Sequence, residues 1–227
     1  VAFRMLPESV WSLPTKGTIN LHTSLLPNYR GAAPINWVLI NGEECTGITT
    51  FYIDHKIDSG AIIMQDKVTL TNNTTAAQLH NTLMNNGSTL LLKTLDSIHK
   101  GIVASKNQIH NNTMNDAPKI TKELCRINWS NSAINIHNLI RGLSPFLDSN
   151  NKLKDVAICP SAWFILEDEN GIQKRIKIHH SELVDAASNS SLNISTDNKT
   201  SFIINVDDKA ISILHLQAEG KNPMSIQ

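Results

Sequence analysis

Apolar and polar positions alternate with a period of two in three short segments of the first half of the chain. These segments are residues 18–22, 47–53 and 61–70, and each is enriched in β-branched or aliphatic residues. Such alternation is typical of β-strands. We therefore predict three strands, with a loop over residues 24–30 after the first strand and a polar turn over residues 54–60 between the other two.

Helical spacing of apolar residues follows in the same half. Leu79, Leu83, Leu90, Leu91, Leu95 and Ile98 form a helical pattern. This pattern predicts a helix over residues 74–100, broken near Gly87. A shorter helix is predicted over residues 31–41, with Pro34 in its first turn and Gly42 just beyond its end. Helices interleaved with strands predict an α/β fold.

The second half of the chain has a different pattern. A polar, Asn-rich segment at residues 101–119 predicts a linker, and a helix is expected over residues 130–142 with Ser130 as its N-cap. Beyond Pro145 the β-like runs are residues 157–167, 175–184, 201–206 and 210–216, with a polar loop over 185–200. Short strands separated by turns predict a small, OB-like β-barrel. The expected domains are residues 1–116 and residues 117–227.

Composition changes this picture little. The 227 residues carry 20 basic and 20 acidic side chains, so net charge does not point to a nucleic-acid partner. The three cysteines, Cys45, Cys125 and Cys159, are far apart and predict free thiols in a reducing compartment. Neither a signal peptide nor a membrane-spanning apolar run is evident. We therefore expect a cytoplasmic protein without a membrane partner.

The first residues look like the end of a buried strand. Val1-Ala2-Phe3 is apolar and follows no turn, and a domain rarely begins inside a strand. The end at Gln227 is equally abrupt. We therefore expect the chain to be a fragment that lacks the front of its first domain and the end of its second.

Candidate chemistry is concentrated on the first predicted strand. Asn20 and His22 are two residues apart, so their side chains share one face of the strand. An amide can donate to a developing oxyanion, and an imidazole can move a proton. Asp54 and Asp58, in the polar turn, are the candidates for a carboxylate that orients the imidazole. On these residues alone, Asn20 and His22 could equally form a structural pair.

A longer motif surrounds these residues. Residues 20–35 read Asn-Leu-His-Thr-Ser-Leu-Leu-Pro-Asn-Tyr-Arg-Gly-Ala-Ala-Pro-Ile. The first eight resemble the signature of the formyl-folate transferases, and Tyr29–Ile35 resembles the methionyl-tRNA formyltransferase branch of that family. Ile57-Asp58-Ser59-Gly60 resembles a family loop downstream, and residues 117–123, 127–129 and 140–145 resemble the entry to its second domain. The resemblance covers nearly the whole chain.

The resemblance implies a partial Rossmann-like catalytic domain followed by a tRNA-binding domain. It assigns Asn20, His22 and Asp58 to the catalytic trio. Residues expected to line the folate pocket are Ser24, Leu25, Leu26, Pro27, Arg4 and Leu6. The formyl donor would be 10-formyltetrahydrofolate, the acceptor the α-amino group of initiator methionyl-tRNA, and the enzyme a monomer.

Other readings stay open at this point. A relative could formylate an amino-sugar nucleotide or hydrolyse the formyl-folate, and a fragment could bind tRNA or folate without catalysis. No metal is expected, because the adjacent residues His179 and His180 would point to opposite faces of a strand.

Overall fold

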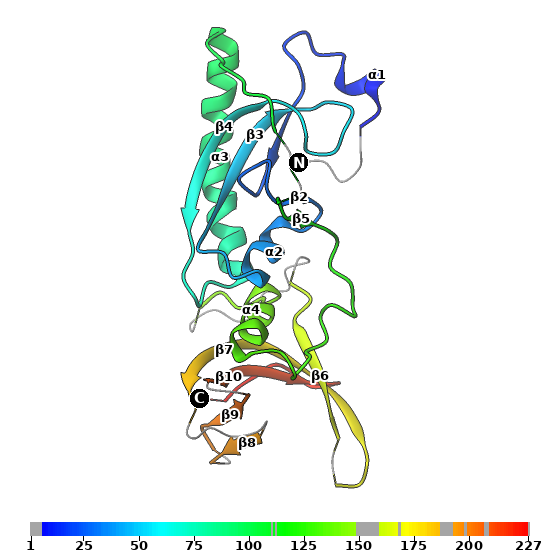
Figure 1. Ribbon diagram of the computed structural model, residues 1–227, viewed down its shortest axis with the longest axis vertical. Helices are drawn as coiled ribbons and strands as arrows, with labels where there is room; N and C mark the ends of the chain where they lie inside the picture. Colours follow the sequence, from blue (N-terminus) through cyan, green and yellow to red (C-terminus); the bar gives the residue numbers. More distant parts are fainter. Residues whose placement is uncertain are drawn as a thin grey trace. The chain divides into compact units, whose positions relative to one another are not determined.

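The computed structural model describes residues 6–109, 111, 113–148, 159–167, 169–186, 193–197, 199–206 and 209–226. The chain forms two compact units. The first consists of residues 1–38, 43–71 and 79–119, and the second of residues 39–42, 72–78 and 120–227. The expected α/β unit and the β-rich second unit are both present (Figure 1).

The first unit contains a small antiparallel sheet. Its strands lie in the order β1 (Ile19–His22), β3 (Cys45–Tyr52) and β4 (Ile62–Thr69). The three predicted strands are therefore confirmed to within two residues at each end. Six of the eight residues of β3 are buried, since the strand has a neighbour on each edge and is also covered by helix α3 (Ala76–Lys100) at Thr50 and by Leu25 at Gly47.

Helix α3 runs alongside this sheet in Figure 1, and from Leu79 onward it belongs to the first unit. The predicted break at Gly87 is wrong, because the helix is continuous. A Cβ atom at Gly87 would lie 3.2 Å from the Leu21 side chain, so the glycine permits close packing of α3 on β1. The hydroxyl groups of Thr50 on β3 and Thr94 on α3 are also hydrogen-bonded, at 2.8 Å.

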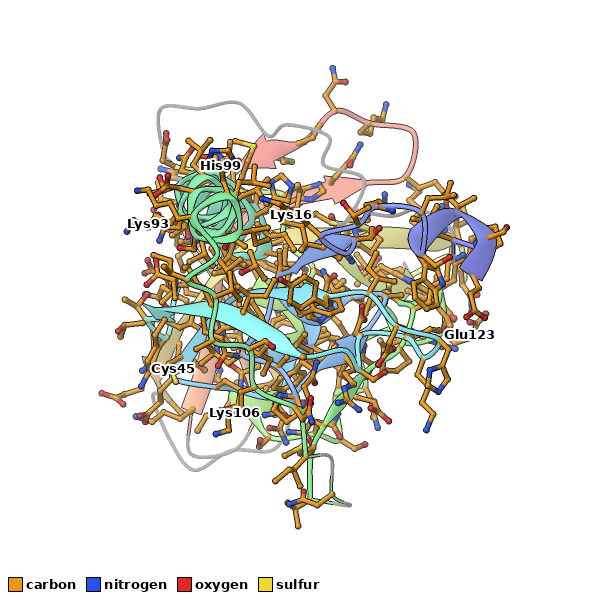
Figure 2. The ribbon with its side chains drawn as sticks, turned by 90° about the horizontal axis from the view of Figure 1, so that it is seen from above. Lys16, Cys45, Lys93, His99, Lys106 and Glu123 are labelled. Carbon is orange, nitrogen blue, oxygen red and sulfur yellow. The ribbon has the colours of Figure 1, made fainter. Side chains whose placement is uncertain are left out.

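Three further features of the first unit differ from expectation. A short helix that the sequence did not predict, α1, spans Glu8–Trp11, and the helix expected over 31–41 is confined to α2 (Pro34–Ile40). Lys16, after α1, donates to the carbonyl of His99 in the last turn of α3, and Figure 2 shows the two residues side by side. The predicted linker is not a free tether, since its residues β5 (Asp116–Ala117) pair in parallel with β2 (Arg30–Gly31).

The second unit is built on one antiparallel sheet. Its order is β6-β7-β10-β9-β8, and β11 pairs with β10. The strands are β6 (Ala162–Glu167), β7 (Gln173–Asp185), β8 (Asn193–Thr196), β9 (Phe202–Asn205), β10 (Lys209–Ala218) and β11 (Met224–Ser225). Strands β7 and β10 curve in Figure 1, and their register shifts near His215, which bends the ladder as a bulge does. The loop expected over 185–200 instead contains β8.

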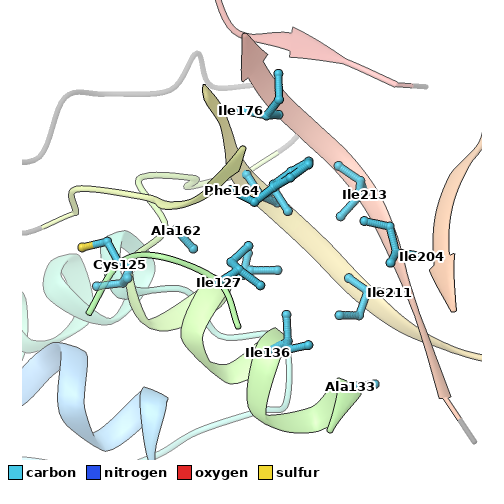
Figure 3. Packing of buried hydrophobic residues seen from close by; sticks show 13 residues of the cluster. Cys125, Ile127, Ala133, Ile136, Ala162, Phe164, Ile176, Ile204, Ile211 and Ile213 are labelled. Carbon is cyan, nitrogen blue, oxygen red and sulfur yellow. The ribbon is translucent and has the colours of Figure 1, made fainter. Parts of the chain in front are cut away.

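A buried apolar cluster joins this sheet to helix α4 (Ala133–Gly142). Figure 3 shows Ile136 of the helix facing Ile211 and Ile213 of β10, with Ile127 and Phe164 beside them. The N-cap of α4 is Ser132, whose hydroxyl accepts from the Asn135 amide, so the prediction of Ser130 as N-cap is wrong. Burial of the apolar cluster removes its side chains from water, which is the main stabilising contribution to the unit.

Histidines are unusually buried in this unit. His179 is bonded to Ser161 and Gln217 through its two ring nitrogens, whereas His180 stacks on Phe146 with ring centroids 3.9 Å apart. The two adjacent histidines therefore have different surroundings. Burial lowers the pKa of both imidazoles to about 4, and His215 adds to the effect on each.

Because of these two histidines, we expect the folded protein to be less stable against unfolding in mild acid. An unfolded histidine takes up its proton near pH 6.5, whereas folded His179 and His180 do so near pH 4. Protons therefore bind the unfolded chain preferentially, and stability that is complete above about pH 6.5 falls as the pH approaches 4. Thermal unfolding between pH 7.5 and 5 should show a smaller fall in midpoint for His180→Phe than for the native protein. The exposed His99→Phe serves as control, and equal slopes for all three proteins would contradict the prediction.

Candidate active site

The candidate site begins on strand β1. The register pairs Asn20 with Phe51 and His22 with Thr49, so the two residues lie on one face of the strand. Leu21, between them, points toward Gly87 of α3. Asn20 and His22 are therefore on the face of β1 that is turned away from this helix. The Asn20 side-chain oxygen accepts from the Leu21 amide, and no described residue accepts from its side-chain nitrogen.

His22 is held from two sides. Its side chain is only 7% exposed, with Nε2 at 2.8 Å from the Tyr29 carbonyl oxygen. Its Nδ1 lies 3.5 Å from Asp58 Oδ2, a contact that is longer than a good N–H···O hydrogen bond. Since a carbonyl oxygen can only accept, Nε2 carries a proton in this arrangement. Nδ1 is then the nitrogen that can gain or lose one.

Asp58 reaches His22 from the turn between β3 and β4. Its backbone is in the left-handed region with φ of 52°, a conformation uncommon for a residue other than glycine. The Gly31 amide donates to Asp58 Oδ2 at 3.1 Å, so the oxygen that faces His22 is also fixed by a backbone group. The site is therefore assembled from β1, β2 and this turn.

Asp54, the other candidate carboxylate, has a different role. Its Oδ1 accepts from the Lys56 amide and from the Ser59 hydroxyl, which closes the turn on itself. Gly60 ends the turn where a Cβ atom would collide with the Tyr52 carbonyl oxygen. The structure thus brings Asp58, and not Asp54, to the imidazole.

The segment Ser24–Pro27 is anchored mainly by its backbone. Thr49 Oγ1 donates to the Ser24 carbonyl and accepts from the Leu26 amide, while Gln65 donates to the Leu26 carbonyl. Leu25 packs against Gly47, where a Cβ atom would meet its side chain. This segment is the loop for which the sequence predicted folate contacts. Of the other two predicted folate residues, Leu6 is 37% exposed and Arg4 is outside the described residues.

Two residues of the predicted linker belong to this site, and sequence reasoning missed both. Asn115 accepts from Tyr29 through its carbonyl at 2.6 Å, and its own amide donates to the Asn28 side chain. Gln108 bonds to Arg30 and to the carbonyl oxygens of the Asp58 turn. The only signal for Asn115 was its position near the family-like segment that begins at residue 117.

Close packing of β2 against β5 yields a testable expectation. Gly31 has φ of 121°, and a Cβ atom there would lie 2.6 Å from the Ala117 carbonyl oxygen. Gly31→Ala should therefore displace the amide that holds Asp58, lower stability by about 1–3 kcal/mol and reduce turnover. Urea unfolding and an activity assay check both effects. Gly101→Ala is the matched control, since Gly101 also has positive φ but no atom within 4 Å; equal losses for the two variants would exclude the steric explanation.

The described residues contain no group of three potential metal-ligating side chains. None of the described helices is long and apolar enough to cross a bilayer. Cys125 and Cys159 are buried free thiols, and burial raises the pKa of Cys159 to about 12.

Two regions of the chain match known protein families. Residues 2–95 match the Formyl transferase domain, and residues 119–227 match the Formyl transferase, C-terminal domain. The chain is 45% identical over 226 residues to the methionyl-tRNA formyltransferase of Flavobacterium johnsoniae and 44% identical over 231 residues to that of Phocaeicola vulgatus. Each alignment covers 100% of this chain and 67% of the relative, so the chain spans about two thirds of their length.

Solved structures with the same fold are more distant in sequence. The N-formyltransferase from Helicobacter canadensis in complex with folinic acid and dTDP-3-aminofucose matches 86% of this chain and 65% of its own, with a TM-score of 0.63 and 24% identity. HypX from Aquifex aeolicus in complex with tetrahydrofolic acid matches 99% of this chain and 36% of its own, with a TM-score of 0.68 and 17% identity. These likenesses support the fold.

Proposed function

Since this chain belongs to the methionyl-tRNA formyltransferase family, we propose that it transfers the formyl group of 10-formyltetrahydrofolate to the α-amino group of initiator methionyl-tRNA, and that Asn20, His22 and Asp58 carry the reaction. The observation that supports the assignment best is the His22 Nδ1–Asp58 Oδ2 contact of 3.5 Å beside the Asn20 amide on the same strand face. An amide can stabilise the oxyanion of acyl transfer to an amine, and an imidazole oriented by a carboxylate can move the proton.

In the proposed reaction the neutral α-amine attacks the formyl carbon. Its nitrogen forms a bond to that carbon, and the formyl oxygen becomes an oxyanion. The Asn20 side-chain nitrogen, which donates to no described residue, would donate to this oxygen. The carbon–N10 bond then breaks, N10 gains a proton and the former amine loses one.

The His22–Asp58 pair would carry the proton. Nε2 is occupied by the Tyr29 carbonyl, so Nδ1 and the carboxylate beside it are the groups through which the proton passes. Asp58 also balances the charge of a protonated imidazole. The Tyr29 contact fixes the ring, so the exchange does not require the side chain to reorganise.

The folate would lie beside the Ser24–Pro27 loop. Hydrogen bonds with Thr49 of β3 and Gln65 of β4 hold the backbone of this loop, so the loop would form a rigid side of the folate pocket. Leu6, which is 37% exposed, would contribute apolar surface to the same pocket, and Arg4 is proposed by resemblance alone. Rigid support of this kind reduces the entropy lost on binding.

We also propose that residues 1–116 are part of the catalytic domain and that residues 117–227 form the tRNA-binding domain. The protein would act as a monomer in the cytoplasm, where charged tRNA and reduced folates are both present. Light scattering measures the molar mass of the purified full-length protein in solution, and we expect the mass of one chain.

An acceptor-specificity assay tests the function itself. The full-length protein that carries this sequence is mixed with 10-formyltetrahydrofolate in three separate reactions. The first contains initiator methionyl-tRNA, the second contains an amino-sugar nucleotide, and the third contains no acceptor other than water. We expect formyl-methionine on the tRNA. Formylation of the sugar, or release of formate without an acceptor, would instead support a sugar formyltransferase or a hydrolase. The 227-residue chain assayed alone shows whether it retains catalysis.

A further inference from the structure

Gln108 is placed where it can control the position of Asp58. It lies in the segment between α3 and β5, far from the site in sequence, and its side chain is half-buried. Its amide nitrogen donates to two backbone carbonyls of the turn, at 3.0 Å to Asp58 and 2.7 Å to Gly60. Both hydrogens of the amide are therefore used on the turn that presents the carboxylate.

The other end of the same amide is equally engaged. Gln108 Oε1 accepts from Arg30 Nε at 3.2 Å and from Arg30 Nη2 at 2.6 Å. All four hydrogen-bonding positions of the amide are then occupied, two as donors and two as acceptors. The reverse orientation of the amide would place its oxygen against two carbonyl oxygens, so the arrangement has one favourable state.

The turn needs such support. Asp58 has positive φ, which costs free energy for a residue with a side chain. Asp54 and Ser59 bond to each other within the turn, whereas Gln108 holds its backbone from outside. Arg30 precedes Gly31, whose amide donates to Asp58 Oδ2, so Gln108 links both segments that fix this carboxylate.

We propose that Gln108 is a positioning residue for the proposed formyl transfer, acting through Asp58. This inference rests on the proposed function, because it gives Asp58 a role in the reaction. Gln108 touches no reacting group. Its effect is to keep the Asp58 carboxylate beside His22 Nδ1, which lies 3.5 Å from Oδ2, and a displacement of about 1 Å can cost roughly 10²-fold in rate.

Gln108→Glu is the most informative change. It conserves shape and strengthens the contact with Arg30, but it places an oxygen where the amide donated to the Asp58 and Gly60 carbonyls. In the full-length protein we expect kcat to fall about 10–100-fold, while KM for folate and for tRNA changes less than about threefold. Gln108→Met, which removes both donors without adding charge, should act in the same direction and replaces the first variant if that fails to fold.

A double-mutant cycle separates positioning from a general structural role. Asp58→Asn alone should lower kcat, and Gln108→Glu added to it should cause less than about a threefold further loss, because the group it positions is already removed. Losses that multiply, or near-native kcat for both Gln108 variants, would overturn the inference. Asn81→Asp, at an exposed position of helix α3 in the first unit, is the matched control and should retain native turnover.

The two proposals fail separately. If Asp58→Asn keeps native turnover, the catalytic trio is wrong and the inference falls with it. If Asp58→Asn lowers turnover and the Gln108 variants do not, the catalytic assignment of Asp58 is supported and only the positioning role of Gln108 is wrong. Far-ultraviolet circular dichroism of each variant establishes that the comparison is made between folded proteins.

Discussion

Replacing His22 by glutamine in the full-length protein is expected to lower kcat for formyl transfer by roughly 10²–10⁴. A glutamine amide can occupy the position of Nε2 and still donate to the Tyr29 carbonyl, which lies 2.8 Å from that nitrogen. It cannot gain or lose a proton near neutral pH. The variant therefore removes the proposed proton transfer while conserving the contact that holds the side chain.

Single-turnover formylation of methionyl-tRNA measures this effect without interference from product release. His99→Gln is the control, since His99 is an exposed residue in the last turn of α3. Turnover within about threefold of native for His22→Gln would remove the proton-transfer role. A large fall in thermal stability of the same variant would show instead that the buried ring is mainly structural.

Asn20→Ala has the second largest expected effect, a fall in kcat of roughly 10²–10³. The side-chain oxygen of Asn20 accepts from the neighbouring Leu21 amide, which orients the nitrogen without occupying it. An oriented donor stabilises an oxyanion better than water does, because it need not reorganise during the reaction. Loss of the donor should therefore affect the transition state more than the bound substrates.

The measurement is the ratio of kcat and KM changes in steady-state assays. We expect KM to remain near its native value, as is usual for an interaction made only in the transition state. Asn20→Asp keeps the acceptor for Leu21 but not the donor, so it should be at least as impaired as Asn20→Ala. Asn73→Ala, at an exposed loop position, should have native kinetics. An active Asn20→Asp enzyme would exclude the oxyanion role.

Much of the fold follows from local sequence patterns. Strands β1, β3 and β4 carry alternating or apolar residues, and packing on both faces of β3 adds to the signal. Strand β8 was missed because all four residues of Asn193–Thr196 are exposed and carry no apolar alternation. The N-cap of α4 was misplaced by two residues because Ser130 and Ser132 fit the local rule equally well.

The misread position Gly87 shows how packing overrides local preference. A glycine in a helical pattern usually weakens the helix, so a break was predicted. Here the missing side chain leaves room for Leu21 of the neighbouring strand. This requirement depends on which residue lies opposite, and one sequence does not contain that information.

The candidate site divides in the same way. Asn20 and His22 were predicted from spacing, but the choice between Asp54 and Asp58 came from family resemblance, since both lie in one short turn. Gln108 gave no signal, because it bonds to backbone carbonyls of Asp58 and Gly60, which any sequence would offer. Residues that support a site through the backbone are therefore the hardest to predict.

The second unit is not a single stretch of chain, and this matters for anyone who wants to express it separately. Residues 72–78 supply the Asn72 carbonyl to His137, and within the same stretch Thr75 and Gln78 donate to carbonyls at residues 146 and 147. A recombinant piece cut at residue 117 would leave the buried His137 ring and these carbonyls without those partners. To fold stably, such a piece would need residues 72–78 restored, either by circular permutation or as a separate peptide.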